Sequence, residues 1–184
     1  MPLPKKLTYT IKDIYDLPEG QCAELVDGQM YMMAPPSKIH QKLVQELSRF
    51  FGNYIAEKGS SCEVYPAQFA VFLIADDKNY VEPDISIICD KKSSQTRAAV
   101  APLISLLKWF SPSSQRMDYL TKLFKYRAAG VREYWIVNPA KETVQTYPFE
   151  GAEDSCQFTF SDSVTAKLFK DLVICVADLL ATKV

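Results

Sequence analysis

Val81-Glu82-Pro83-Asp84-Ile85-Ser86-Ile87-Ile88 is the stretch of this 184-residue sequence that decides the fold. Its composition predicts a strand, and successive side chains of a strand lie on opposite faces of the sheet. One face would carry Val81, Pro83, Ile85 and Ile87, and the other Glu82, Asp84, Ser86 and Ile88. An acid within an apolar strand must be hydrated, paired or bound to a cation. Asp84 is therefore the first candidate for a functional site.

Pro83 affects the backbone next to Asp84. Proline removes one donor from the ladder of a sheet, so we expect a strand end or a bulge where Asp84 opens toward a cleft. Taken alone, a carboxylate in water at the edge of a strand explains the same residue equally well.

The flanking segments predict an α/β sandwich, in which helices cover a mixed sheet. Hydrophobic spacing and turn residues delimit each element. In chain order, the predicted elements are a short helix (7–20), a hairpin (23–34), a helix (39–55), two strands of a hairpin (62–75 and 80–89), a strand (103–110), a helix (117–129), two strands (131–137 and 143–149) and a short helix (172–180). The central part of this order is helix-strand-strand-strand-helix-strand.

The composition is that of an ordinary globular protein, with 48% hydrophobic and 23% charged residues and a net charge of −1. These values exclude a disordered or collagen-like chain, and they give no bulk basicity for coating nucleic acid or an anionic membrane. The apolar runs are too short to cross a bilayer, and the N-terminus does not resemble a signal peptide. We therefore expect one domain over residues 1–184 in the cytoplasm, with no membrane partner.

The five cysteines are odd in number, widely spread and without a CxxC pair or a Cys/His cluster. They are Cys22, Cys62, Cys89, Cys156 and Cys175. We interpret them as reduced, mostly buried thiols, because cytoplasmic proteins seldom keep disulfides, and we expect no zinc site.

The predicted helix 117–129 carries a second group of candidate residues. Steps of four place Asp118, Lys122 and Tyr126 on one stripe. The apolar side of the helix, which we expect to be buried, carries Met117, Leu120, Leu123, Phe124 and Ala128. Considered alone, the polar stripe is better explained as an ordinary surface Asp/Lys pair. His40, the single histidine, is more often a hydrogen-bonded structural group than a catalyst in such a context.

Several motifs together resemble a known family. They are Glu24-Leu-Val-Asp-Gly, Met30-Tyr-Met-Met-Ala-Pro-Pro-Ser, His40-Gln, Glu82-Pro-Asp-Ile-Ser, Ser111-Pro-Ser-Ser, Asp118 with Lys122 and Tyr126, and Ala129-Gly-Val-Arg-Glu-Tyr-Trp-Ile-Val-Asn-Pro. In order and spacing they resemble the Uma-two family of "putative restriction endonucleases" over about residues 20–150. The resemblance implies the PD-(D/E)XK nuclease fold, whose helix-strand-strand-strand-helix-strand core is the order predicted above.

The resemblance also implies a site for phosphodiester hydrolysis of DNA. Asp84 matches the metal ligand of the second core strand, and Lys122 matches a lysine that the family carries on the following helix. Glu24 and His40 match motif positions whose roles are open. The implied cofactor is Mg²⁺ or Mn²⁺, because carboxylate oxygens suit hard cations that activate water.

One departure from the family concerns the third strand. The family pattern Ala-Pro-Asp-(apolar)3-Glu carries a second metal-binding acid, whereas this chain has Lys108 at the position of that Glu. No carboxylate occurs between Asp90 and Asp118. Codons chosen for residues 102–110 read Ala-Pro-Asp-Phe-Ile-Ile-Glu-Met-Val when begun one base earlier. We therefore hypothesise that residues 93–110 are an out-of-frame translation between two indels.

This departure predicts a chain that binds metal weakly and cuts DNA slowly or not at all. In the alternative interpretation, Lys108 points to solvent and Trp109 fills core. Three candidate functions are compatible with these sequence features. The leading one is a nuclease-fold hydrolase, here with reduced or absent activity. The second is a catalytically dead module that binds nucleic acid or a protein, and the third is an assembly protein that forms a homodimer through a sheet edge.

Overall fold

A computed structural model of the protein describes residues 8–89, 103–109, 117–151, 154–169 and 171–181, with backbone alone for 103–109 and 117–119. The elements are α1 (Ile11–Tyr15), β1 (Ala23–Val26), β2 (Gln29–Met32), α2 (Lys38–Glu57), β3 (Glu63–Pro66), β4 (Ile85–Ile88), β5 (Leu103–Trp109), the π-helical segment η1 (Met117–Lys122), α3 (Leu123–Ala128), β6 (Glu133–Asn138), β7 (Thr143–Pro148), β8 (Cys156–Thr159), β9 (Ser163–Thr165), β10 (Val173–Cys175) and α4 (Val176–Ala181). Among the residues described, no helix has the length and apolar character needed to cross a bilayer.

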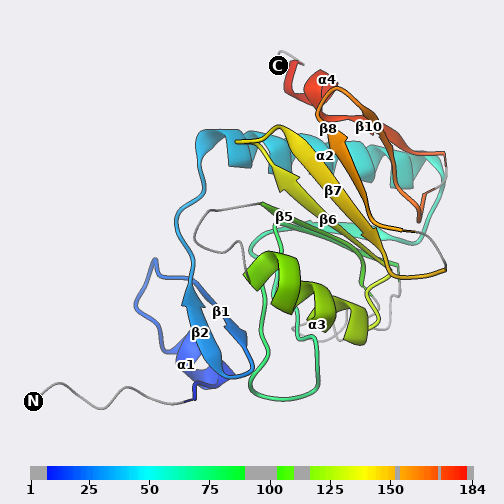
Figure 1. The fold of residues 1–184 in the computed structure, drawn as a ribbon. Coiled ribbons are helices and arrows are strands. Elements are labelled where there is room, and N and C mark those ends of the chain that lie inside the picture. The colour runs from blue at the N-terminus through cyan, green and yellow to red at the C-terminus, as the bar shows by residue number, and fades with distance from the viewer. Residues whose placement is uncertain (1–7, 90–102, 110–116, 152–153, 170, 182–184) are drawn as a thin grey trace, which may run out of the picture.

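A six-stranded mixed sheet is the centre of the molecule, with strand order β3-β4-β5-β6-β7-β8 (Figure 1). Only β5 and β6 pair in parallel, and the other neighbours are antiparallel. Parallel neighbours need a crossover, which runs through η1 and α3 here. The predicted α/β class, the core order and the N-terminal hairpin are confirmed.

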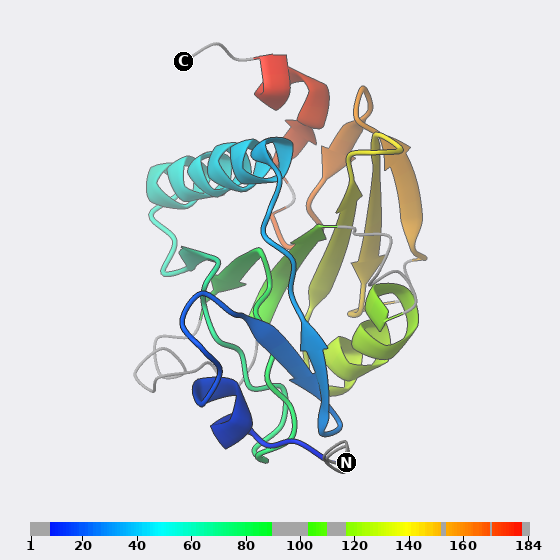
Figure 2. The same ribbon diagram turned by 90° about the vertical axis from the view of Figure 1, so that its left-hand side faces the viewer.

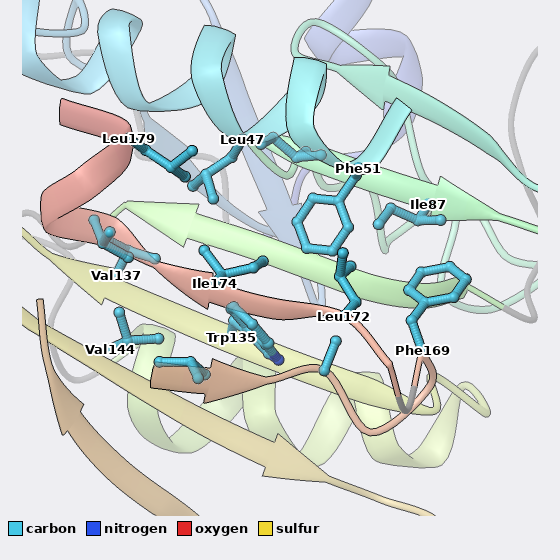
Figure 3. Packing of buried hydrophobic residues seen from close by; sticks show 14 of the residues in the cluster. Leu47, Phe51, Ile87, Trp135, Val137, Val144, Phe169, Leu172, Ile174 and Leu179 are labelled. Carbon is cyan, nitrogen blue, oxygen red and sulfur yellow. The ribbon is translucent and has the colours of Figure 1, made fainter. Parts of the chain in front are cut away.

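The two faces of the sheet have separate hydrophobic cores, because side chains alternate along each strand. Phe51 and Leu47 of α2 pack against Ile87 of β4 and Trp135 of β6 on one face (Figure 3), with Phe51 and Trp135 in edge contact at 6.2 Å. The opposite face is covered by α3 and by the hairpin β1–β2, which lie next to each other (Figure 2). The predicted alternation is confirmed within β4, where Ile85 and Ile87 face one core and Ile88 the other, but Val81 lies in the core of Ile88 and not, as predicted, in that of Ile85.

Several predicted elements were wrong in part. The helix expected over 7–20 is only α1, and the strand expected over 80–89 is only β4, preceded by isolated bridges at Tyr80 and Val81. The strand expected over 62–75 ends at Pro66, since proline cannot continue the ladder, and only a single bridge, Val71 to Val81, follows. The segment 172–180, predicted as a helix, is β10 followed by α4. The β-branched pair Val173-Ile174 favours the strand, which pairs with β9.

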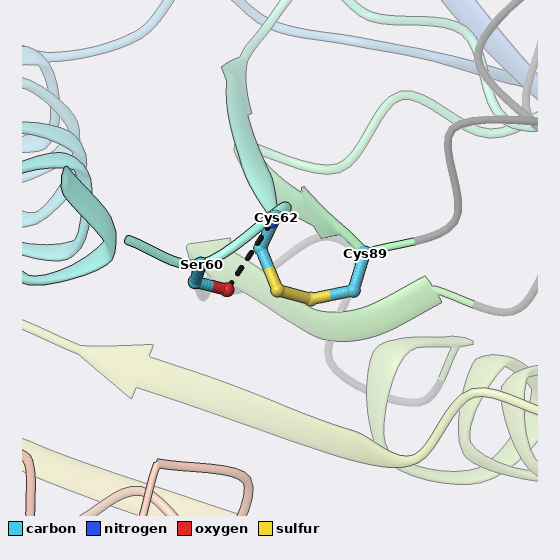
Figure 4. The surroundings of a disulfide bond; sticks show 3 residues. All are labelled: Ser60, Cys62 and Cys89. Atoms are coloured by element: carbon cyan, nitrogen blue, oxygen red, sulfur yellow. Dashed lines mark hydrogen bonds between the residues drawn. A yellow bond between two sulfur atoms is a disulfide. The ribbon is translucent and has the colours of Figure 1, made fainter. Parts of the chain in front are cut away.

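Two cysteines correct the expectation of free thiols. Cys62 and Cys89 form a disulfide (Figure 4). The pairing of Glu63 with Ile88 places these cysteines opposite each other at the ends of β3 and β4, although 27 positions separate them in the sequence. Cys22, Cys156 and Cys175 are free.

Alkylation tests the disulfide. In unreduced, denatured protein we expect three reactive thiols, and five after reduction. Because the crosslink closes a long loop, Cys62→Ser should lower the free energy of unfolding by about 3–4 kcal/mol without reductant. In reductant, the variant and the parent should unfold at similar denaturant concentrations. Cys156→Ser is the control, and five reactive thiols in the unreduced protein would show that the pair is reduced.

Glu133 of β6 ties the C-terminal segment to the sheet. Its buried carboxylate accepts hydrogen bonds from the indole Nε1 of Trp135 (2.7 Å) and from the backbone amides of Lys167 and Leu168 (both 3.1 Å). Removal of the carboxylate would take this acceptor away from all three donors, of which the indole of Trp135 is buried. Glu133 is therefore a structural residue within the Ala129–Pro139 motif.

Removal of this carboxylate should destabilise the protein. We expect Glu133→Ala to lower the free energy of unfolding by about 3 kcal/mol, measured by urea denaturation. Glu133→Gln, which keeps one acceptor oxygen, should lose less. The matched control is Glu150→Ala, which removes an exposed partner of Arg132 and should cost less than about 1 kcal/mol. Equal losses for Glu133→Ala and Glu150→Ala would contradict this role.

Candidate active site

Asp84 lies directly before β4, at the strand end that Pro83 predicts. Its backbone carbonyl accepts a hydrogen bond from the amide of Ala67 at 2.9 Å, which anchors the segment to the end of β3. The residue is 7% exposed. The alternative of a carboxylate in water at a strand edge is therefore wrong, because this carboxylate is buried and has a partner.

That partner is His40, in the first turn of α2. Ser37 caps the helix by accepting the amide of His40 at 3.3 Å. The imidazole Nε2 of His40 then lies 3.0 Å from Oδ1 of Asp84. The two side chains come from elements 44 positions apart. His40 is thus a hydrogen-bonded histidine, as expected of a lone one, but its partner is the leading candidate site residue.

Lys122 and Glu24 form a second buried pair. The ammonium of Lys122, at the end of η1, donates to Oε2 of Glu24 in β1. The other oxygen of Glu24 accepts the backbone amide of Glu82 at 3.2 Å. Glu24 therefore contacts both the helix that carries Lys122 and the segment that leads to Asp84.

This pair contradicts most of the orientation predicted for the helix 117–129, although Leu123 packs against the core as predicted. Lys122 and Tyr126 are 1% and 0% exposed, whereas Leu120 and Phe124 are 55% and 70% exposed. A buried ammonium needs a carboxylate, and Glu24 supplies it; the ring of Tyr126 packs edge-on against Tyr134 at 4.9 Å. The interpretation of Lys122 as part of a surface Asp/Lys pair is therefore wrong. The side chain of Asp118 lies outside the described residues.

Glu82 is a buried acid that the sequence reasoning did not select. It lies two positions before Asp84, it is 8% exposed, and its Oε1 accepts the hydroxyl of Tyr80. Its Oε2 has no hydrogen-bond partner within the described part of the chain. Burial, and next the hydrogen bond to Glu82, raise the pKa of Tyr80, so Tyr80 stays a donor at neutral pH. The alternation that placed Glu82 beside Asp84 was the signal that could have identified it.

The sheet register locates the departure in the third strand. Ile85 of β4 pairs with Leu107 of β5, so the next step of this antiparallel ladder brings Asp84 opposite Lys108. Ser111-Pro-Ser-Ser and residues 93–102 lie outside the described residues. The position at which the resemblance implies a second acid is therefore the sheet neighbour of Asp84.

The donors present do not fit a tightly held divalent cation. A hard cation is bound by several oxygen ligands, and a magnesium site draws on one or two carboxylates plus waters or substrate phosphates. Within 8–89, 117–151, 154–169 and 171–181, no three His, Cys, Asp or Glu side chains gather in a way that could hold a metal. Asp84 is the candidate ligand that the resemblance implies, and a lysine stands at the adjacent register position.

Comparison with known proteins identifies a family for this chain. The family model Uma2, described as "Putative restriction endonuclease", matches residues 11–176. The chain belongs to the Uma2 (Uma-two) family. This Uma2 chain is 26% identical over 125 residues to an uncharacterized protein of Synechocystis, a match that covers 67% of the chain and 64% of that relative's length.

A solved structure shares the fold of this Uma2 protein. It is the crystal structure of a putative nuclease belonging to DUF820 from Anabaena variabilis, with a TM-score of 0.74 and 16% identity. The similarity covers 94% of this chain and 97% of the Anabaena chain. The nuclease-like fold that the sequence resemblance implied is thereby confirmed.

The buried Glu24–Lys122 pair of this Uma2 protein should show strong energetic coupling. We expect Glu24→Gln and Lys122→Met each to lower the free energy of unfolding by about 3–5 kcal/mol, because each removes the counter-ion of a buried charge. The double variant should lose clearly less than the sum, as measured by urea denaturation.

An exposed ion pair provides the control for this cycle. Asp171→Asn removes the exposed partner of Lys58, which lies 3.2 Å away, and should cost less than about 1 kcal/mol. Additive losses from Glu24→Gln and Lys122→Met would mean that the two side chains do not interact.

Proposed function

We propose that this protein is a restriction-endonuclease-like hydrolase of DNA phosphodiesters, dependent on Mg²⁺ or Mn²⁺, whose cleavage is slow or absent because Lys108 replaces the second metal-binding acid. The Uma2 family and the nuclease fold support a nuclease-like function. The reduced activity is supported by one observation, which is the register that sets Lys108 opposite Asp84.

The net charge around Asp84 would determine how tightly a divalent cation binds there. A second carboxylate beside Asp84 would add attraction for a divalent cation, whereas an ammonium at that position repels the cation and competes with it for Asp84. When bound, a cation would lower the pKa of a water molecule and offset the charge of the phosphate. With Lys108 in place, we expect Asp84 to hold such an ion only weakly.

The other candidate residues would act on the Asp84 carboxylate and on the phosphate. His40 holds one oxygen of the Asp84 carboxylate and so limits its orientation. Lys122 supplies an ammonium that would steady the negative charge developing on the phosphate during hydrolysis. We assign His40 the role of orienting Asp84, and Lys122 that of stabilising the transition state.

A binding module on the same fold is the second candidate function. The same register favours it, because a lysine at the position opposite Asp84 would weaken cation binding, and hydrolysis with it, without removing the fold. Such a module would bind duplex DNA, or a protein partner, with no hydrolysis.

The origin of residues 93–110 is part of the proposal. Residues 93–102 and 110 lie outside the described residues, and the remaining residues form β5 as a regular strand. We propose that this segment is an out-of-frame translation. Sequencing the gene across it decides the question, since a nucleotide sequence that yields no Ala-Pro-Asp-(apolar)3-Glu motif in a neighbouring frame excludes the idea.

Restoration of the acid tests the function. We expect Lys108→Glu to raise nicking of supercoiled plasmid in Mg²⁺ or Mn²⁺ by about 100-fold or more, because it adds a metal ligand and removes a competing charge. Nicking is measured by agarose gel against the unaltered chain, with EDTA as the metal-free condition.

Three controls make this assay specific. Lys108→Ala removes the ammonium without adding an acid and should restore little activity. Asp84→Asn and Lys122→Met, each combined with Lys108→Glu, should abolish the gain. Full activity of the unaltered chain would contradict the proposed inactivity. Duplex binding by fluorescence anisotropy, with no cleavage by any variant, would select the binding module.

A further inference from the structure

The N-terminal hairpin contributes a carboxylate to the buried interior beside the candidate active site. We infer that Glu24 is a positioning residue, which sets where the Lys122 ammonium stands relative to Asp84 during catalysis. This inference rests on the proposed nuclease function. It gives a role to a residue that family resemblance leaves without one, and it makes the hairpin β1–β2 part of the active site.

The two oxygens of Glu24 have different partners. Oε2 accepts from the Lys122 ammonium, and Oε1 accepts from the backbone amide of Glu82, two positions before Asp84. One rigid carboxylate therefore links the helix that carries the amine to the segment that carries the metal-binding acid. A shift of Glu24 would change the separation between Lys122 and Asp84.

The backbone of Glu24 is itself held against that segment. The neighbouring residue Leu25 exchanges two backbone hydrogen bonds with Tyr80, from Leu25 N to Tyr80 O at 2.7 Å and from Tyr80 N to Leu25 O at 2.8 Å. Glu24 pairs with Tyr31 across the hairpin. The carboxylate of Glu24 thus extends from a strand that hydrogen bonds hold on both sides. A positioning group requires such a rigid support.

Because both side chains are buried, the position of the Glu24 carboxylate determines where the Lys122 ammonium lies. The lysine is 1% exposed and Glu24 is 4% exposed, so water does not solvate the ammonium in place of the carboxylate. A lysine side chain has four flexible bonds, and a loose ammonium would spend little time at one place. Fixing it in advance lowers the reorganisation needed when a phosphate arrives, and misplacement by about 1 Å can cost about 100-fold in rate.

Two substitutions separate charge from position. Glu24→Gln keeps the shape of the side chain and removes its charge, whereas Glu24→Asp keeps the charge and withdraws it by one methylene. Both are made in whichever of the unaltered chain and the Lys108→Glu chain cuts plasmid faster. We expect Glu24→Gln to lower kcat about 10-fold or more with KM within twofold, and Glu24→Asp to lower it less.

A matched control separates positioning from folding. Glu46 is also buried and paired, through Arg49 Nη2 at 2.6 Å, but it lies in α2 outside the site. Glu46→Gln should destabilise the protein and leave kcat unchanged when all rates are measured below the unfolding transition. Unchanged kcat in both Glu24 variants would overturn the inference alone and leave a purely structural ion pair. A parent that cuts no DNA under any condition would overturn the proposed function, and this inference with it.

Discussion

The buried ion pair between Glu24 and Lys122 is the constraint on which the arrangement of the site depends. An ammonium cannot stay inside a protein without an opposing charge, so the crossover helix must turn its polar side inward to meet the hairpin. That orientation exposes Leu120 and Phe124 to solvent, at the cost of apolar burial. The exposure of these apolar side chains costs less than the alternative, because rotating the helix the other way would leave the carboxylate of Glu24 buried without the lysine.

A second constraint comes from the sheet. Alternation along β4 sends Ile85 and Ile87 into the core beneath α2 and leaves Asp84 at the end of the strand, where Pro83 stops the ladder. Helix α2 starts beside this end and brings His40 to Asp84. The candidate site is thus the meeting point of a strand end and a helix start, and Glu24 links the helix of the crossover to the segment that leads into it. The site therefore depends on local backbone structure: on the alternation along β4, on the end of the ladder at Pro83 and on the start of α2.

The sequence predicts the parts of this protein that depend on local pattern. Hydrophobic spacing located α2 and the crossover helix, and the Asp27-Gly28 dipeptide located the hairpin turn, where both residues have positive φ. It could not predict which face of the crossover helix is buried, because that depends on Glu24, which is 98 positions away from Lys122. The Cys62–Cys89 crosslink depends in the same way on a strand register that no local pattern specifies.

Family membership and fold together do not decide whether this chain cuts DNA. They describe a scaffold that brings Asp84 and His40 into contact and holds Lys122 through Glu24. Cation binding is different, because it depends on the sum of charges at one point, and in the proposed function the charge of Lys108 offsets that of Asp84. If the proposed function holds, this scaffold keeps its fold and its polar pairs and loses its chemistry at one register position of β5.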